Sequence, residues 1–275
     1  MMALDLILAV ACALLLGVSV ALQKRGIGSA WRDSIRSPVW LAGAGLELIA
    51  DGCYLGAASA TGARLTIMQP IVVLHFLVAM AVGLIALRER FSAREWLAAG
   101  ALVVGGALVL ATAFMSTPAA EHGADRSLAL ALTLAALALG ILGGVAVRRM
   151  HSSETLTAIC AGLVFSGSVV ATRIAGMDYR AGDDGLVHLL TTSVAPLLVV
   201  VGSVGGFVLM QQALRAGRAA IVSPVVALVT LVVPLPIGVA VFHEDMPATS
   251  AAGSMLVAVA LVLLLTAASR ASHLN

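Results

Sequence analysis

Nine apolar stretches follow one another along this sequence, each long enough to cross the ~30 Å hydrocarbon core of a bilayer as a helix of about 20 residues. They cover residues 3–22, 38–60, 65–87, 96–115, 127–147, 155–176, 189–213, 219–241 and 248–267. Hydrophobic residues make up 61% of the chain and charged residues only 11%, whereas soluble domains carry roughly a quarter charged residues. The sequence therefore predicts an all-α, polytopic membrane protein with nine transmembrane helices.

The basic residues predict how these helices are oriented. Twelve Lys and Arg residues fall on one side of the predicted membrane: Lys24, Arg25, Arg32, Arg36, Arg88, Arg90, Arg94, Arg148, Arg149, Arg215, Arg218 and Arg270. The other side holds only Arg64, Arg126, Arg173 and Arg180. Because basic residues gather on the cytoplasmic side, we expect the N-terminus outside and the C-terminus in the cytoplasm, with the chain in the plasma (inner) membrane. Trp31, Trp40 and Trp96 fall on the same cytoplasmic side, where tryptophans anchor helices at the interface.

The sequence lacks the motifs of common enzyme classes. It contains no nucleotide-binding loop, HExxH motif, zinc-ligand spacing or GxSxG motif, and no connection is long enough to form a catalytic domain. Cys12, Cys53 and Cys160 all fall inside apolar runs and are expected to be packing residues. Neither an enzymatic activity nor a resident cofactor is expected.

Two acids interrupt the second span. Glu47 and Asp51 are four residues apart, so they share one face of a helix. A carboxylate within a membrane costs at least a few kcal/mol, which makes it a functional hypothesis by default, and two close carboxylates require a proton or a cation between them. Mg²⁺ is usually held by one or two carboxylates and several waters, so Glu47 and Asp51 are candidate metal ligands. The same pair suits a proton acceptor and a substrate-amine acceptor, and structural hydrogen bonding is the plainer alternative.

Four more polar residues in the spans are candidates for a solute site: His75, Gln69, Ser223 and Gln211. His75 is interpreted either as a proton relay or ligand or as a packed residue. Gln69 and Ser223 each precede a proline, which frees backbone carbonyls that commonly line a cavity. Gln211 offers an amide oxygen near the cytoplasmic end of the seventh span. Hydrogen bonding between helices is the alternative role of these residues.

Other features of the spans are interpreted structurally. Glycines four residues apart predict close helix packing at Gly52/Gly56, Gly140/Gly144 and Gly202/Gly206. Pro234 and Pro236 predict a kink in the eighth span. Lys24 and Arg173 stand at the ends of their spans, where anchoring to lipid headgroups explains them, with a gating ion pair as the alternative.

The chain contains an internal repeat. GVSVALQKRG, residues 17–26, resembles GSVVATRIAG, residues 167–176, and ARLTIMQPIVV from Ala63 resembles GRAAIVSPVVA from Gly217. We pair Ser19 with Ser168 and Lys24 with Arg173, each one position out of register with the run ends, Pro70 with Pro224 and, at span ends, Glu89 with Glu244. Helices 1–4, in a first half of residues 1–115, therefore repeat as helices 6–9, in a second half of residues 116–275, within one integral membrane domain. Since five spans separate the two starts, the repeat is inverted, as in secondary transporters with a midplane substrate site.

The quoted runs also resemble a known family. Together with ATGARLTIMQPIVVLHFLVAMAVGLIALRERFSAREW and QQALRAGRAAIVSPVVALVTLVVPLPIGVAVFHED, they are similar to the drug/metabolite transporter superfamily, and within it to the NIPA-like magnesium transporter branch. The resemblance covers nearly the whole chain and implies alternating access by two pseudo-symmetric halves around a small solute. It does not fix the solute, because a fold hosts many functions and the site decides among them.

These observations lead to one expected function and two alternatives. We expect a secondary transporter or facilitator of a small solute, with Mg²⁺ or another divalent cation as the best candidate. A proton-coupled small-metabolite or drug carrier is the alternative within transport, and a non-transporting membrane scaffold is the alternative of another class. The expected partners are the lipid bilayer and the solute or cation, with a homodimer as an option and no nucleic acid.

Overall fold

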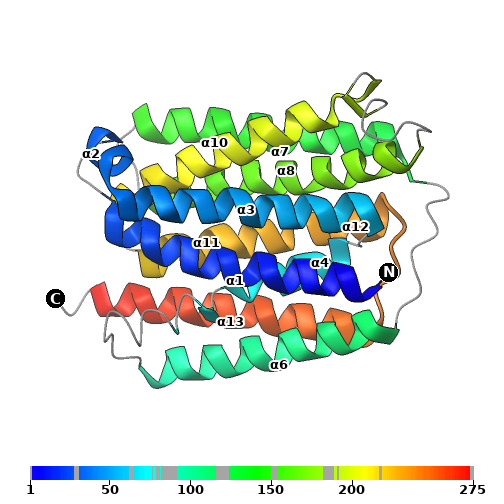
Figure 1. Ribbon diagram of the computed structural model, residues 1–275. Coiled ribbons are helices and arrows are strands. Elements are labelled where there is room, and N and C mark those ends of the chain that lie inside the picture. Colours follow the sequence, from blue (N-terminus) through cyan, green and yellow to red (C-terminus); the bar gives the residue numbers. More distant parts are fainter. Residues whose placement is uncertain are drawn as a thin grey trace.

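The structure is a computed structural model that describes residues 2–27, 31–61, 65–75, 77–78, 81, 92–115, 124–149, 154–181, 189–190, 192–216 and 219–272. Every regular element within these ranges is a helix. The long helices lie side by side in one bundle, running parallel or antiparallel to one another, and the two termini lie at opposite ends of the bundle (Figure 1).

The helices follow the predicted spans closely. Their bounds are α1 (Met2–Gly26), α2 (Trp31–Arg36), α3 (Pro38–Thr61), α4 (Leu65–Val73), α6 (Ala93–Met115), α7 (Arg126–Arg149), α8 (Glu154–Ala181), α10 (Ala195–Ala216), α11 (Ala219–Val232), α12 (Pro234–Ala240) and α13 (Ala248–Ser272). Much of the third predicted span, and Glu89 after it, lie outside the described residues. The eighth span is divided at Val233 into α11 and α12, as expected from Pro234, because its ring cannot continue the hydrogen bonding of the preceding helix.

Six helical segments of the described chain are long and apolar enough to cross a membrane: Ile7–Gly26, Ala93–Thr112, Arg126–Arg149, Glu154–Tyr179, Ala195–Ala216 and Val222–Ala240. Large apolar side chains cover the outside of the bundle. Leu142 is 68% exposed, Leu197 64% and Met255 71%. Such an apolar surface is unfavourable in water and favourable in contact with lipid hydrocarbon. The prediction of a multi-pass, all-α membrane protein is confirmed at this level.

Most of the described basic residues gather at one end of the bundle. α1, α7 and α10 finish at the end where α2 and the C-terminus lie (Figure 1). Their last turns contain Lys24 and Arg25, Arg148 and Arg149, and Arg215. We call this the basic end. The N-terminus, the end of α3 and the link between α12 and α13 lie at the opposite end.

Close helix contacts form where glycines remove side chains. A Cβ added to Gly144 would lie 2.5 Å from Leu209, and one added to Gly206 would lie 2.8 Å from Phe165, so the packing predicted for those two glycine pairs is confirmed. The prediction is wrong for Gly52, because a Cβ there would meet no described atom within 4 Å. The same spacing therefore marks a helix contact on some faces and an open surface on another.

Asp125 directly precedes α7 at the end of the bundle opposite the basic end. Its Oδ1 accepts hydrogen bonds from the backbone N–H of Leu128 at 3.0 Å and from the hydroxyl of Ser127 at 2.7 Å. These bonds, the first above all, hold the pKa of Asp125 below its usual range because they favour the charged form. Asp125 thus satisfies donors that the first turn of a helix leaves free.

Candidate functional site

Glu47 is a buried acid, only 8% exposed, on the inner face of α3. Its Oε2 accepts a hydrogen bond from Nε2 of Gln23 on α1 and a longer one, of 3.4 Å, from the hydroxyl of Ser19 on the same helix. Gln23 also donates to Ser19 at 2.9 Å. The carboxylate is therefore held by donors from the neighbouring helix, which a buried polar group requires.

The hydrogen bonds continue from α1 to α10. Gln211 donates through Nε2 to Oε1 of Gln23, and its own Oε1 accepts a 3.2 Å bond from the indole N–H of Trp40 on α3. Gln23 and Gln211 are completely buried. Trp40 also contacts Phe207 of α10, with ring centroids 5.9 Å apart. Ser19, Gln23, Trp40, Glu47 and Gln211 form one chain of polar groups, which we call the junction network.

The junction network runs inward from the basic end of the bundle. Trp40 lies near the start of α3, Gln23 near the end of α1 and Gln211 near the end of α10. Glu47 is nine residues into α3, about 14 Å of helix rise from its start. Glu47 is thus the innermost charged group of a polar path that joins α1 and α3 to α10.

Asp51 occupies a different environment from Glu47. It follows one turn later on α3 but is exposed at the surface of the bundle. In the described part of the chain, no group of three or more His, Cys, Asp or Glu side chains lies close enough together to hold a metal ion. A cation at Glu47 would therefore keep most of its water, as Mg²⁺ usually does.

Of the four further polar residues predicted for the site, all but Gln211 lie outside the junction network. Gln69 on α4 is buried and donates a 2.6 Å hydrogen bond to the hydroxyl of Tyr54 on α3, the helix-to-helix role given above as its alternative. Ser223 on α11 is buried, and its hydroxyl has no hydrogen-bond partner among the described residues. Nδ1 of the half-buried His75 lies 2.8 Å from the carbonyl oxygen of Val72. Of the four, only Gln211 is brought together with Glu47.

A second buried polar cluster lies toward the opposite end of the bundle. Glu244, in the link between α12 and α13, accepts hydrogen bonds from the backbone N–H groups of Leu65 at 3.0 Å and Thr66 at 2.9 Å, at the first turn of α4. Its Oε1 lies 3.3 Å from Nε of Arg173 on α8, and the Arg173 guanidinium stands 5.8 Å from the ring centre of Phe242. We call Arg173, Glu244 and the first turn of α4 the α4 clasp.

Two sequence interpretations are corrected by these clusters. Arg173 is 2% exposed and ion-paired, so it is not a headgroup anchor, although its aligned residue Lys24 is exposed at the end of α1. Trp40 is 6% exposed and donates to Gln211, so it is not an interfacial anchor. In both cases the side chain turns inward toward a polar partner from a distant part of the chain, Glu244 for Arg173 and Gln211 for Trp40.

Sequence reasoning missed Ser19 and Gln23 as members of the site. The signal was present, because they are two polar residues four apart at the end of the first apolar run and so share a helix face. Trp40 could not be found in this way, since its partner is 171 residues away along the chain.

The fold and these clusters define a class of protein, a multi-pass membrane helix bundle whose first and second halves are connected by buried polar contacts. Comparisons with protein-family models, with curated proteins and with solved structures find no match.

Proposed function

We propose that this protein is a secondary transporter or facilitator that moves a small, positively charged solute across the membrane. The observation that carries the proposal is Glu47, a carboxylate buried where α1, α3 and α10 meet. Ionisable groups inside a membrane bundle are costly and mark solute or ion paths. Mg²⁺ or another divalent cation is the best candidate for the solute.

The inverted repeat is supported by equivalent contacts in the two halves. α1 packs on α3, and α8 packs on α10 in the corresponding place. Ser19 of α1 bonds to Glu47 of α3, while the aligned Ser168 of α8 donates to the carbonyl of Val199 and pairs with the hydroxyl of Ser203, 2.9 Å away on α10. In each copy the paired serine thus connects equivalent helices, α1 with α3 in the first half and α8 with α10 in the second.

Alternating access is supported by the positions of the two buried clusters. The junction network joins α1 and α3 to α10 near the basic end, and the α4 clasp joins the start of α4 to α8 and to the link before α13 near the other end. Each cluster connects the first half to the second. In our proposal, one connection opens while the other stays closed, so that the path to Glu47 is open from one side at a time.

A divalent cation suits the chemistry at Glu47. Mg²⁺ sheds its water reluctantly and is usually held by one or two carboxylates together with several waters. Asp51, one turn along α3, would attract the ion or receive it next. The nine-helix topology, the NIPA-like branch of the drug/metabolite transporter superfamily and the inner-membrane location all belong to this proposal.

A proton-coupled carrier of a small metabolite or drug is a second candidate. It is favoured by the amide, hydroxyl and indole groups that accompany Glu47, because such groups recognise hydrogen-bonding organic solutes. In that case Glu47 would carry the coupling proton or bind an amine.

The test is Mg²⁺ uptake by purified protein in liposomes. We expect flux in the wild type and a loss of about tenfold or more in Glu47→Gln, the change that ~1.4 kcal/mol of lost binding produces. Asp51→Asn is expected to reduce flux less, since Asp51 lies outside the network. The matched control is Glu154→Gln, which neutralises an acid in the first turn of α8 and should leave flux unchanged.

The possible results separate the hypotheses. No divalent flux in the wild type would overturn the cation assignment, and proton-driven uptake of an organic amine would then support the second candidate. Mg²⁺ flux that survives both neutralisations would retain transport and reject Glu47 as the site. No flux of any solute would favour the membrane scaffold.

A further inference from the structure

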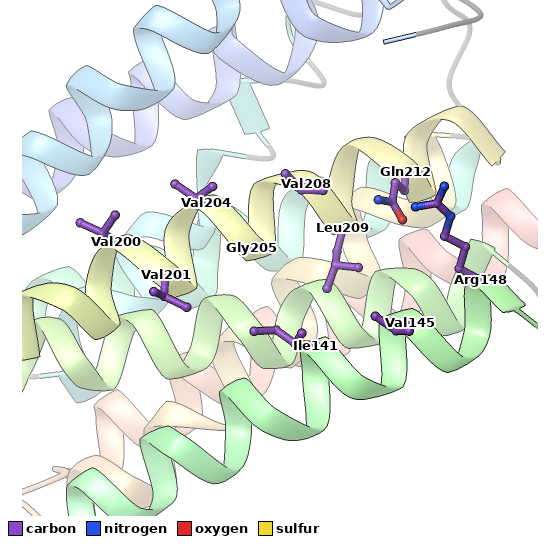
Figure 2. A pocket seen from close by; sticks show the side chains of 11 residues that line it. Ile141, Val145, Arg148, Val200, Val201, Val204, Gly205, Val208, Leu209 and Gln212 are labelled. Carbon is purple, nitrogen blue, oxygen red and sulfur yellow. The ribbon is translucent and has the colours of Figure 1, made fainter.

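An elongated groove lies on the outside of the bundle between α7 and α10. Both helices pack on α8 and have little contact with each other, so they form two walls with α8 beneath them. The groove has a volume of about 500 Å³, and every described residue of its lining belongs to α7 or α10, including Ile141, Val145, Val200 and Val204 (Figure 2).

The walls of the groove are apolar along most of its length. Val200 and Val204 are 59% and 58% exposed, and Gly205, which lies in the lining between α10 residues Val204 and Val208, contributes no side chain to the groove. From Val200 to Gln212 the groove follows α10 for about 18 Å of helix rise. This length is close to one leaflet, which is half of the ~30 Å hydrocarbon core.

One end of the groove is polar and positively charged. Arg148 of α7 and Gln212 of α10 lie together at the end of the lining that is nearest the basic end of the bundle (Figure 2). Arg148 is exposed, so its guanidinium is accessible from the membrane surface. An apolar channel one leaflet long that finishes at a cation has the shape and charge of a lipid with an anionic headgroup.

We propose that this groove is a binding site for an anionic phospholipid. One acyl chain lies along the valines of α10, and the phosphate accepts hydrogen bonds from the Arg148 guanidinium and from the side-chain amide of Gln212. Arginine is suited to this role because its planar fork binds phosphate through two hydrogen bonds. The proposal concerns the outer surface of the bundle and does not depend on the transport function.

Charge argues against a second copy of the chain as the occupant. In a two-fold dimer each subunit contributes the same surface patch, so a parallel dimer across this groove would bring two Arg148 side chains to the same end of one interface. A phosphate would neutralise the positive charge of Arg148, whereas the guanidinium of a second Arg148 would repel it.

The experiment is native mass spectrometry of the full-length protein, titrated in detergent with phosphatidylglycerol or with phosphatidylcholine of the same acyl chains. We expect phosphatidylglycerol to bind more tightly, and Arg148→Gln to weaken it about fivefold, the effect of one basic residue near an anionic lipid. Val204→Phe should also weaken binding, because it fills the groove from an exposed position.

Two matched controls make the result specific. Arg149→Gln removes the neighbouring charge, which is not in the groove lining, and Leu197→Phe enlarges a 64% exposed residue of α10 that lies outside the groove. Both should bind phosphatidylglycerol like the wild type. Equal affinity for the two lipids, or an equal loss in Arg148→Gln and Arg149→Gln, would overturn the proposal. A dimer peak that Val204→Phe removes would replace it with self-association.

Discussion

At the scale of single residues, Arg173 and Glu244 form a buried ion pair in which Glu244 has additional hydrogen-bond partners. Glu244 also accepts two backbone hydrogen bonds from the start of α4, where the helix dipole favours an anion. Glu244→Leu leaves Arg173 charged and buried and leaves two N–H groups without an acceptor. We expect it to destabilise the protein by about 3–5 kcal/mol, the usual result of breaking a buried pair.

Arg173→Met should cost clearly less than Glu244→Leu, because the remaining carboxylate keeps both backbone donors. The measurement is unfolding in mixed micelles titrated with a denaturing detergent, with Asp245→Asn, an exposed neighbouring acid, as the control. Equal losses in the two variants would show that the backbone bonds of Glu244 contribute nothing.

Gln211 and Gln212 offer a second comparison at this scale. Gln211 is completely buried and has partners on both sides, Gln23 and Trp40, whereas Gln212 is half-buried at the groove. Gln211→Leu leaves a buried amide oxygen and an indole N–H unsatisfied, each costing about 1–3 kcal/mol. We expect a lower melting temperature for Gln211→Leu in detergent and little change for Gln212→Leu. The reverse order would contradict the junction network.

The sequence identified some of these residues but not their partners. Glu47 and Gln211 were predicted individually because polar groups in a span are costly and therefore conspicuous. Their connection through Gln23 depends on three helices meeting, which is a tertiary property with no local signal. Arg173 was misread for the same reason, since a cation near a span end is normally explained by lipid headgroups until its partner is seen.

At the scale of helices, α6 and α13 approach each other so closely that their backbones touch. A Cβ added to Gly105 would lie 2.7 Å from the carbonyl oxygen of Gly253, and one added to Gly253 would lie 2.6 Å from that of Gly105. Gly105→Ala and Gly253→Ala should each destabilise the protein by about 1–3 kcal/mol, as overpacking does.

Gly100→Ala provides the matched control for this contact. Gly100 lies on α6 as well, and a Cβ there would meet no described atom within 4 Å. Because alanine is a better helix former than glycine, Gly100→Ala should be neutral or slightly stabilising in the same unfolding measurement. A loss as large as that of Gly105→Ala would mean that glycine flexibility, and not close packing, determines the stability of α6.

Helix positions were more predictable than helix neighbours. Apolar length alone located α1, α3, α6, α7, α8, α10 and α13, because a bilayer requires long, internally hydrogen-bonded segments. The internal repeat did not predict that α6 packs closely on α13. The glycine spacing that predicts helix contacts also occurs at Gly52, where an added Cβ would meet no described atom within 4 Å.

At the scale of the whole molecule, the charge distribution predicts which way the bundle crosses the membrane. α2 and the ends of α1, α7 and α10 share the basic end, and Asp125, Asp178 and the link between α12 and α13 lie toward the other end. Because basic residues are retained on the cytoplasmic side, we expect Asp245 to face the outside and Arg32, on α2, to face the cytoplasm. Both residues are exposed, so cysteines at these positions will react freely with a reagent that reaches them.

The topology is tested by labelling intact cells with a membrane-impermeant maleimide. Asp245→Cys should be labelled without permeabilisation and Arg32→Cys only after it, while the wild type, whose cysteines lie within α1, α3 and α8, supplies the background. Labelling of Arg32→Cys alone in intact cells would show that the orientation is the reverse of the expected one. Labelling of both would place the two ends of the bundle on one side, which is incompatible with helices that each cross the membrane. The expected pattern would place the other members of the junction network on the cytoplasmic side of Glu47 and the α4 clasp on the outer side, so that the proposed access from alternate sides would open past the junction network to the cytoplasm and past the clasp to the outside.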